Sequence, residues 1–316
     1  MRIHRFARPE DLGVLHAGSV ATVGVFDGLH LGHQAILDRL RDAAARRALP
    51  AVCLTFSRHP RSVLRGEAPR QILSLEHRLE LLARQGVDDA LVIDFGPDFA
   101  ALTAEDFVEE LLVRRLGCRE LVIGHDTAVG RDRRGDAEWL GAAGQRYGFR
   151  VVAVGGVSVN GETVSSTAVR AAIAQGDLRH AERLLGRPVS VLGTVVHGQG
   201  RGGSLGFPTA NLEVRSEAFP PLGVYAVRVL TADGPLPAVM NYGLRPTFQQ
   251  DTRHAVFEIH VLDRSDLHLY GQNLEVELVE FLRREQRFES VAELVAQIAR
   301  DCEAARAVFA EAPSGG

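Results

Sequence analysis

Residues 20–39 read VATVGVFDGLHLGHQAILDR, an apolar run that breaks at Phe26-Asp27-Gly28 and continues as a helical pattern. This order predicts a strand, a loop and a helix. His30 and His33 fall at the expected helix start, and residues three positions apart share one face of a helix. The positive end of the helix dipole disfavours imidazolium there but stabilises a bound anion. The stretch therefore predicts an α/β unit whose first helix receives phosphate groups.

The alternative interpretation is a pair of surface histidines or of zinc-binding histidines. A zinc site would need at least one more ligand, and the sequence shows no Cys-x-x-Cys motif and no third histidine close by. The three cysteines, Cys53, Cys118 and Cys302, are widely spaced and odd in number. Such cysteines are typical of free thiols in a reducing compartment. The phosphate interpretation is therefore favoured over zinc.

Short apolar runs alternate with helical patterns through the first half of the chain. The expected strands cover 20–25, 51–56, 90–95, 120–123 and 150–154, and the expected helices 32–47, 75–85, 103–116 and 136–147. This alternation predicts a mostly parallel, doubly wound sheet. Ligands of such sheets bind beyond the carboxyl ends of the strands. Candidate site residues occupy those positions, at 27–33, 57–60 and 124–126.

A second informative stretch is 195–212, VVHGQGRGGSLGFPTANL. If Thr209 and Asn211 lie on an extended segment, their side chains project to one face, and a hydroxyl with an amide oxygen suits a magnesium–nucleotide. Glycines such as Gly198, Gly202 and Gly206 let the backbone approach phosphates and offer N–H donors. An ordinary polar hairpin loop is the alternative, because all these residue types also form turns. The stretch alone leaves both open.

Residues 164–170, VSSTAVR, stand at the start of another expected helix. A Ser or Thr cap followed by a solvated arginine explains this string without any ligand. Arg170, however, would oppose the helix dipole in the first turn, and a bound phosphate would rationalise it.

The character of the sequence changes near Gly186, which ends a helical stretch and is followed by Pro188. Expected strands then cover 189–196, 223–230, 238–241, 257–262 and 275–281, and an amphipathic helix covers 291–309. A small antiparallel barrel closed by a helix fits this pattern. The expected domains are therefore 1–186 and 187–316.

Composition excludes several classes of protein. The formal net charge of −4 gives no indication of nucleic-acid binding. All 36 basic residues are arginine, so a P-loop of the GxxxxGK[ST] kind, which needs its lysine, is absent. No apolar run of membrane-spanning length and no leader pattern occurs, so we expect a cytoplasmic protein with no membrane partner. Oligomerisation is neither indicated nor excluded by the sequence.

The string GVFDGLHLGHQ at 24–34 resembles the HxGH signature of the adenylyltransferase superfamily and, more closely, the bacterial bifunctional riboflavin kinase/FAD synthetases. The string GFPTAN at 206–211 resembles the kinase half of the same family. The two motifs occur in the family's order, and the similarity runs from about Arg5 to about Phe309. The resemblance implies that the barrel has six strands.

For the first domain the resemblance implies an ATP site in which His30, His33 and Arg170 are catalytic. The implied nucleotide-binding residues are Gly24, Phe26, Asp27, His30, Gly32, His33 and, from the SSTxxR-like string, Ser166, Thr167 and Arg170. The implied flavin-binding residues are Phe56, His59, Pro60 and Asp126. The chain departs from the family at Thr127 and Val129, where aromatic residues are usual, and this puts flavin affinity in question.

For the second domain the resemblance implies that Glu258 is the catalytic base, in an E-x-H strand with His260. The solvated face of an edge strand would explain the same alternation without any function. The implied nucleotide-binding residues are Gly198, Gly202, Gly206, Pro208, Thr209 and Asn211, of which Thr209 and Asn211 also hold Mg²⁺. The implied flavin-binding residues are Asn241, Arg245 and Glu258.

Taken together, the resemblance implies two reactions. ATP phosphorylates riboflavin to FMN and leaves as ADP, and a second ATP adenylylates FMN to FAD and releases pyrophosphate; Mg²⁺ serves both steps. One alternative is a monofunctional riboflavin kinase with a degenerate first domain, motivated by Thr127 and Val129. The other is a flavin- or nucleotide-binding regulator without turnover.

Overall fold

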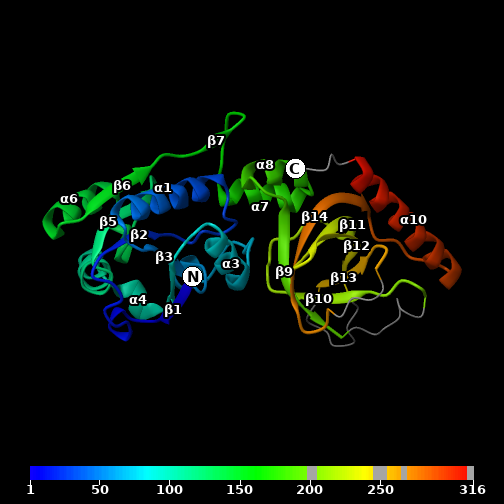
Figure 1. Ribbon diagram of the computed structural model, residues 1–316, viewed down its shortest axis with the longest axis horizontal. Helices are drawn as coiled ribbons and strands as arrows, with labels where there is room; N and C mark the ends of the chain where they lie inside the picture. The colour runs from blue at the N-terminus through cyan, green and yellow to red at the C-terminus, as the bar shows by residue number, and fades with distance from the viewer. Residues whose placement is uncertain (198–204, 245–254, 265–268, 312–316) are drawn as a thin grey trace. The chain divides into compact units, whose positions relative to one another are not determined.

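The computed structural model describes residues 1–197, 205–244, 255–264 and 269–311. The chain divides into two compact units, Met1–Val169 and Arg170–Gly316 (Figure 1), and each is described by itself.

The first unit is built on a six-stranded sheet in the order β1-β4-β3-β2-β5-β6, in which every neighbouring pair is parallel. This confirms the parallel α/β sheet expected from the sequence. The strands are β1 (Arg2–Phe6), β2 (Ser19–Val23), β3 (Ala51–Phe56), β4 (Asp89–Ile93), β5 (Cys118–Gly124) and β6 (Arg150–Val154). The chain order reverses between the neighbours β2 and β5, which is the kind of switch point where such sheets bind ligands.

The helices of this unit lie close to the expected ranges. They are α1 (Leu31–Arg47), α2 (Pro60–Arg65), α3 (Leu75–Arg84), α4 (Pro97–Ala101), α5 (Ala104–Asp106), a π-helical segment (Phe107–Arg115) and α6 (Ala137–Tyr147), with short 3₁₀ turns at Pro9–Asp11 and Arg131–Arg133. A small hairpin joins β7 (Ser158–Val159) to β8 (Glu162–Thr163). The edge strand β1 was not expected, because its RIHRF sequence is largely polar and mostly exposed.

The core of the first unit lies between the sheet and its helices. Buried side chains of β2 to β5 pack against the π-helical segment and α6, and the fully buried ones include Leu54, Leu91, Leu111 and Leu140. Each such fully buried side chain stabilises the fold by roughly 1.5–3 kcal/mol.

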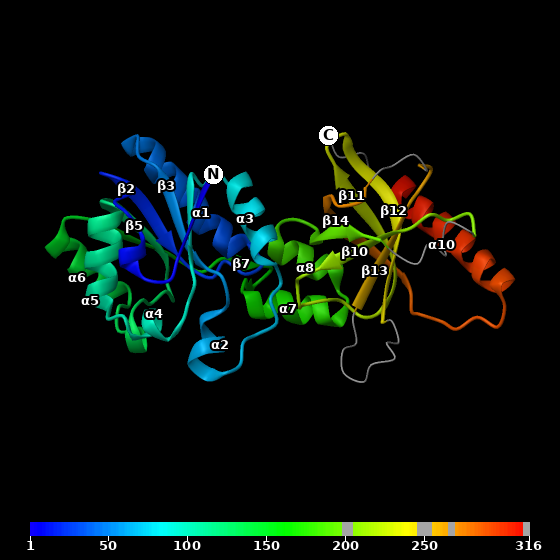
Figure 2. The same ribbon diagram turned by 90° about the horizontal axis from the view of Figure 1, so that it is seen from below.

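The second unit begins within α7 (Ser166–Gln175) and continues through α8 (Leu178–Leu185) into a closed barrel. Its strands are β9 (Val189–Val196), β10 (Ala210–Val214), β11 (Gly223–Thr231), β12 (Gly234–Leu244), β13 (Ala255–Val261) and β14 (Asn273–Arg283), in the closed order β10-β13-β12-β11-β14-β9. This confirms the six-stranded antiparallel barrel. The C-terminal helix α10 (Val291–Glu311) packs beside β11 and β12 (Figure 2).

The two compact units divide between Val169 and Arg170, whereas the sequence pattern changes at 186–187. The difference concerns α7 and α8, which continue the helical pattern of the first half. Arg179 of α8 forms an ion pair with Glu280 of β14, with 3.3 Å between nitrogen and oxygen. The boundary between the two functional domains stays a prediction.

Candidate active sites

A tight turn follows β2 at the carboxyl edge of the sheet. Its residues Phe26, Gly28 and Leu29 all have positive φ, at 52°, 87° and 44°. Positive φ is unfavourable for residues with a side chain, and such strain persists only where the surroundings fix it. Phe26 and Leu29 are almost completely buried. Their burial offsets the strain, so the turn is held in one conformation immediately before α1.

His30 and His33 lie together at the start of α1, as the sequence predicts. His30 is the N-cap, and its Nδ1 accepts the backbone N–H of His33 at 3.4 Å. The two rings stack with centroids 3.7 Å apart, and Phe26 meets His33 edge-on at 5.2 Å. Because Nδ1 of His30 accepts, the neutral ring carries its proton on Nε2, which makes that atom a donor. Among the described residues, none forms a hydrogen bond to the buried Nδ1 of His33.

The pKa of His33 lies well below its ordinary value, first because of burial and then because of the charges of His30 and Arg78. Burial disfavours the charged form of an imidazole, and nearby positive charge does so further. His33 is therefore neutral at pH 7, as expected at the positive end of a helix.

Two glycines make room for these rings. A Cβ added at Gly32 would lie 3.2 Å from two ring atoms of His30, and one at Gly24 would lie 3.1 Å from the ring of Phe26. Both distances are shorter than ordinary van der Waals contact. The glycine inside the HxGH string thus permits the ring of His30 to lie over the helix start.

Asp27 anchors neighbouring segments to this turn. Its carboxylate accepts the backbone N–H groups of Ile72 and Leu73 at 2.9 and 3.1 Å, and its carbonyl accepts the hydroxyl of Ser166 at 2.8 Å. Ser166 begins α7, Thr167 next to it is exposed, and Arg170 stands one turn after Ser166 on the same face. The structure therefore brings the start of α7 beside the turn that precedes α1.

The expected flavin residues lie along the same edge of the sheet. Phe56 ends β3, and His59 caps α2 by accepting the N–H of Arg61 at Nδ1, 3.1 Å away, with Pro60 at the first helical position. Asp126 follows β5, and its carbonyl accepts from Arg133 at 2.8 Å. Since β3, β2 and β5 are neighbours in the sheet, the loops after them share one edge.

The two departures from the family pattern have different surroundings. Val129 is buried in the main core, and its backbone pairs with Gly135. The backbone N–H of Thr127 donates to the carbonyl of Gly124 at 3.1 Å and closes the turn after β5. At position 129 the side chain thus fills the core.

In the barrel, three expected site residues form one row across adjacent strands. Glu258 on β13 pairs directly with Asn211 on β10 and with Asn241 on β12. Residues directly opposite in an antiparallel pair have Cβ atoms about 4.5–5.5 Å apart and project to the same face. Strand register therefore places a carboxylate between two amides. Thr209 precedes β10, so only Asn211 of the expected metal pair lies on a strand.

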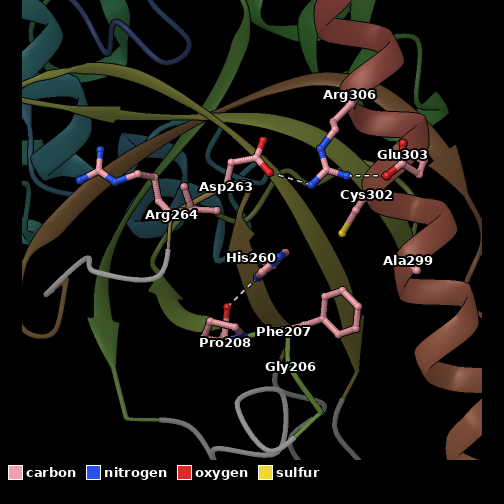
Figure 3. A pocket seen from close by; sticks show the side chains of 11 residues that line it. Gly206, Phe207, Pro208, His260, Asp263, Arg264, Ala299, Cys302, Glu303 and Arg306 are labelled. Carbon is pink, nitrogen blue, oxygen red and sulfur yellow. Dashed lines mark hydrogen bonds and ion pairs between the residues drawn. The ribbon is translucent and has the colours of Figure 1, made fainter.

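A cavity of about 430 Å³ lies beside His260, which is on the same strand as Glu258 (Figure 3). It is lined by Gly206, Phe207, Pro208, His260, Val261, Asp263, Arg264, Ala299, Cys302, Glu303 and Arg306. His260 Nδ1 lies 2.8 Å from the carbonyl oxygen of Pro208. A carbonyl can only accept, so Nδ1 of His260 is the donor. Figure 3 shows Arg306 between Asp263 and Glu303, at 2.8 and 2.7 Å from their oxygens.

Three of the expected site residues, Gly198, Gly202 and Arg245, lie outside the described residues. Sequence reasoning missed Arg78, whose buried guanidinium faces the turn before α1. It also missed Glu285, whose carboxylate lies against Gly243 in β12, close to the amide of Asn241. Neither residue belongs to a short motif. In the sequence, Arg78 occupies an ordinary polar position of an amphipathic helix, and only the tertiary structure shows that it is buried.

Two family models match the chain, FAD synthetase over residues 14–168 and riboflavin kinase over residues 185–309. The Bifunctional riboflavin kinase/FMN adenylyltransferase of Escherichia coli K12 is 42% identical over 294 residues, which cover 92% of this chain and 93% of the relative. The chain belongs to this bifunctional family. The relative of the same name from Pseudomonas fluorescens is 42% identical over 303 residues, covering 96% and 95%.

Solved structures include a similar fold. A crystal structure named as a macrolide-efflux protein from Streptococcus pneumoniae matches with a TM-score of 0.82 and 33% identity, covering 97% of this chain and 99% of that one. That name belongs to the streptococcal protein. The likeness shows that a solved protein shares the fold of this bifunctional riboflavin kinase/FMN adenylyltransferase family member.

Two further observations concern membranes and metals. No helix within the described ranges is both long and apolar enough to cross a bilayer. Within the same ranges, no cluster of three or more His, Cys, Asp or Glu side chains is arranged to hold a metal ion.

Proposed function

We propose that the barrel transfers the γ-phosphate of ATP to riboflavin, giving FMN and ADP. The sheet domain then adenylylates FMN with a second ATP, giving FAD and pyrophosphate. The observation that carries this proposal is that both halves of a known two-step family are present with their motif residues juxtaposed: the histidine pair at α1, and the Asn211–Glu258–Asn241 row in the barrel. The functional domains are taken as 1–186 and 187–316.

In the kinase, Glu258 accepts the proton of the riboflavin hydroxyl as its oxygen attacks the γ-phosphorus and ADP leaves. Asn241 and Arg245 orient the flavin beside it. The hydroxyl of Thr209 and the amide oxygen of Asn211 are hard oxygen donors, which suit Mg²⁺. Bound Mg²⁺ supplies positive charge to the phosphates. The pairing of Asn211 with Glu258 supports this assignment, because it places a metal-type ligand next to the base.

The cavity beside Pro208 has room for the nucleoside part of ATP. Its lining residues Gly206, Phe207 and Pro208 directly precede Thr209 in the chain, so a nucleoside there lies beside the segment that carries Thr209. Phe207 offers an aromatic surface to a base, and Gly206 has the positive φ of 84° that a close turn needs. We assign Gly198 and Gly202 to the phosphates on the sequence motif alone.

In the adenylyltransferase, a phosphate oxygen of FMN attacks the α-phosphorus of ATP, and pyrophosphate leaves with the electrons of the broken anhydride bond. His30, His33, Ser166, Thr167 and Arg170 bind the phosphates and stabilise the charge that develops on them. No covalent enzyme intermediate is needed. The flavin contacts Phe56, His59, Pro60 and Asp126 along the same edge.

The wider assignments follow from the same proposal. Its ligands are riboflavin, FMN, FAD, ATP, ADP and pyrophosphate, together with Mg²⁺, and it acts in the cytoplasm without nucleic acid or membrane partners. A monofunctional kinase is less well supported. Val129 fills the core, so the absence of the aromatic residue that is usual in the family at this position says little about flavin binding.

Incubation of the purified protein with riboflavin, ATP and Mg²⁺, with chromatography of the flavins over time, tests the proposal. We expect FMN to appear first and FAD to follow. FMN without FAD, even with FMN supplied directly, would favour the monofunctional kinase. Flavin binding without ATP consumption would instead identify a regulator without turnover.

A further inference from the structure

Arg78, in the first turn of α3, is a buried cation with only 3% of its surface exposed. Its guanidinium donates from Nη1 to the carbonyl of Val25 at 2.6 Å and from Nη2 to the carbonyl of Phe56 at 2.7 Å. Burying an arginine is costly unless its donors are satisfied. No described residue accepts from its Nε. Burial of Arg78 therefore carries a free-energy cost that only some of its hydrogen bonds offset.

The two carbonyls locate the guanidinium at the carboxyl edge of the sheet. Val25 leads from β2 into the strained turn at 26–29, and Phe56 ends β3 before the loop that carries His59 and Pro60. The hydroxyl of Thr55 also donates to the carbonyl of Val25, at 3.2 Å. A planar guanidinium fixes two acceptors at a set separation, which an ammonium group does less well. Arg78 therefore joins the segment before the histidine pair to the segment before the expected flavin residues.

We propose that Arg78 is a positioning residue for adenylyl transfer: its guanidinium clamps the ends of β2 and β3 and so holds the turn that presents His30 and His33. This inference rests on the proposed adenylyltransferase function and deepens it. Arg78 acts through the backbone and through its charge, without touching the substrate. A displacement of reacting groups by about 1 Å lowers rates by as much as about a hundredfold.

The charge of Arg78 adds a second contribution. The groups that face Arg78 are Asp27, Glu76 and the buried thiol of Cys53, and those that face His33 are His30 and Arg78 itself. Positive charge at Arg78 helps to keep the pKa of His33 low. Removing that charge relieves the repulsion. This change raises the pKa of His33, so the ring becomes protonated at a higher pH.

The test compares three variants of the full chain. Arg78→Met removes the donors and the charge, and Arg78→Lys keeps the charge without the planar fork. Arg115→Met is the matched control in the same unit. Arg115 also donates to a main-chain carbonyl, that of Leu12 at 2.6 Å, and its buried Nε likewise has no hydrogen-bond acceptor among the described residues. It lies near the amino ends of the strands, next to Leu116, whose carbonyl accepts from Ser19 at the start of β2.

Each variant is assayed for FAD formation from supplied FMN across pH, and for FMN formation from riboflavin. For Arg78→Met we expect FAD formation to fall at least about tenfold, FMN formation to stay at the wild-type rate, and the acid limb of the FAD profile to move to higher pH. Arg78→Lys should recover part of the rate and keep the wild-type acid limb. Arg115→Met should change neither reaction.

Several results would overturn the inference. Arg78→Met with an unchanged FAD rate excludes positioning, and a lower rate with an unmoved acid limb indicates a structural role alone. If Arg78→Met does not fold, Arg78→Lys decides, because a full wild-type rate contradicts the clamp. A wild-type protein that makes FMN but never FAD would instead refute the proposed adenylyl transfer, and the inference with it.

Discussion

The two sites of this chain are held in place by different physical means. At the sheet edge, buried polar anchors and a strained turn fix the histidine pair: Asp27 caps two backbone amides, and Phe26 and Leu29 keep positive φ only because they are buried. In the barrel, strand register sets Glu258 between Asn211 and Asn241. The comparison teaches that side-chain anchors and a strained turn hold the residues of one site, whereas direct strand pairing brings the residues of the other together.

Glu258→Gln gives the largest expected effect, because it removes the base while the strand register remains. FMN formation should fall about 10²- to 10⁴-fold, the range typical of general-base catalysis. FAD formation from supplied FMN and the stability of the barrel should not change. Glu213→Gln is the matched control, since Glu213 is an exposed carboxylate on the neighbouring strand β10. A near wild-type rate of FMN formation by Glu258→Gln would remove Glu258 from its role.

Gly32→Ala tests whether the sheet site is as sensitive to packing as its comparison with the barrel site implies. The added Cβ would lie 3.2 Å from two ring atoms of His30, so the ring must move. We expect FAD formation to fall about tenfold, which corresponds to about 1.4 kcal/mol, with FMN formation unchanged. Gly141→Ala is the control, because α6 leaves open space there and alanine favours a helix. Equal effects of the two substitutions on FAD formation would contradict the tight packing of His30.

The difference between the sites also explains how much the sequence could predict. The histidine pair and the start of α7 are encoded in contiguous strings, and the structure brings them together as expected through Ser166 and Asp27. The alternation of patterns predicted the parallel sheet and five of the six barrel strands, and the family resemblance supplied the sixth, β10. Strand β1 escaped prediction, because at an exposed edge RIHRF has no apolar periodicity.

Arg78 and Glu285 escaped prediction for another reason. Their burial or proximity to a site depends on which segments pack together, and a charged residue in a sequence is ordinarily expected to be exposed. The row in the barrel was only half predictable. Its residues could be chosen from the family motifs, but their direct pairing depends on strand register. The roles of all these residues remain predictions until variants are assayed.

A smaller effect concerns the pH dependence of stability at the sheet site. The folded pKa of His33 is depressed below 6.5, its ordinary value, so the unfolded chain binds the proton first. Stability therefore falls as the pH drops below about 6.5, with a slope of at most about 1.4 kcal/mol per pH unit for one proton. The His33→Asn variant should lack this pH-dependent part of the free energy of unfolding. The His197→Asn variant, which changes an exposed histidine, should retain it.

Chemical denaturation measures this difference in the first unit by itself. The chain has a single tryptophan, Trp139, which packs against the core of that unit, so its fluorescence reports unfolding there. If the free energy of unfolding changed with pH in the same way for the wild type and His33→Asn, His33 would not be held neutral by the fold.

The smallest expected effect comes from His260→Ala in the barrel, which tests whether side-chain contacts matter there at all. His260 donates to the carbonyl of Pro208, immediately before Thr209, and lines the cavity assigned to ATP. One hydrogen bond contributes about 1 kcal/mol, so the KM for ATP in FMN formation should rise about fivefold with little change in kcat. His260→Asn can still donate and should recover part of that loss. If His260→Ala instead lowered kcat as strongly as Glu258→Gln, backbone register would not be sufficient to position the kinase site, and the contrast between the two sites would fail.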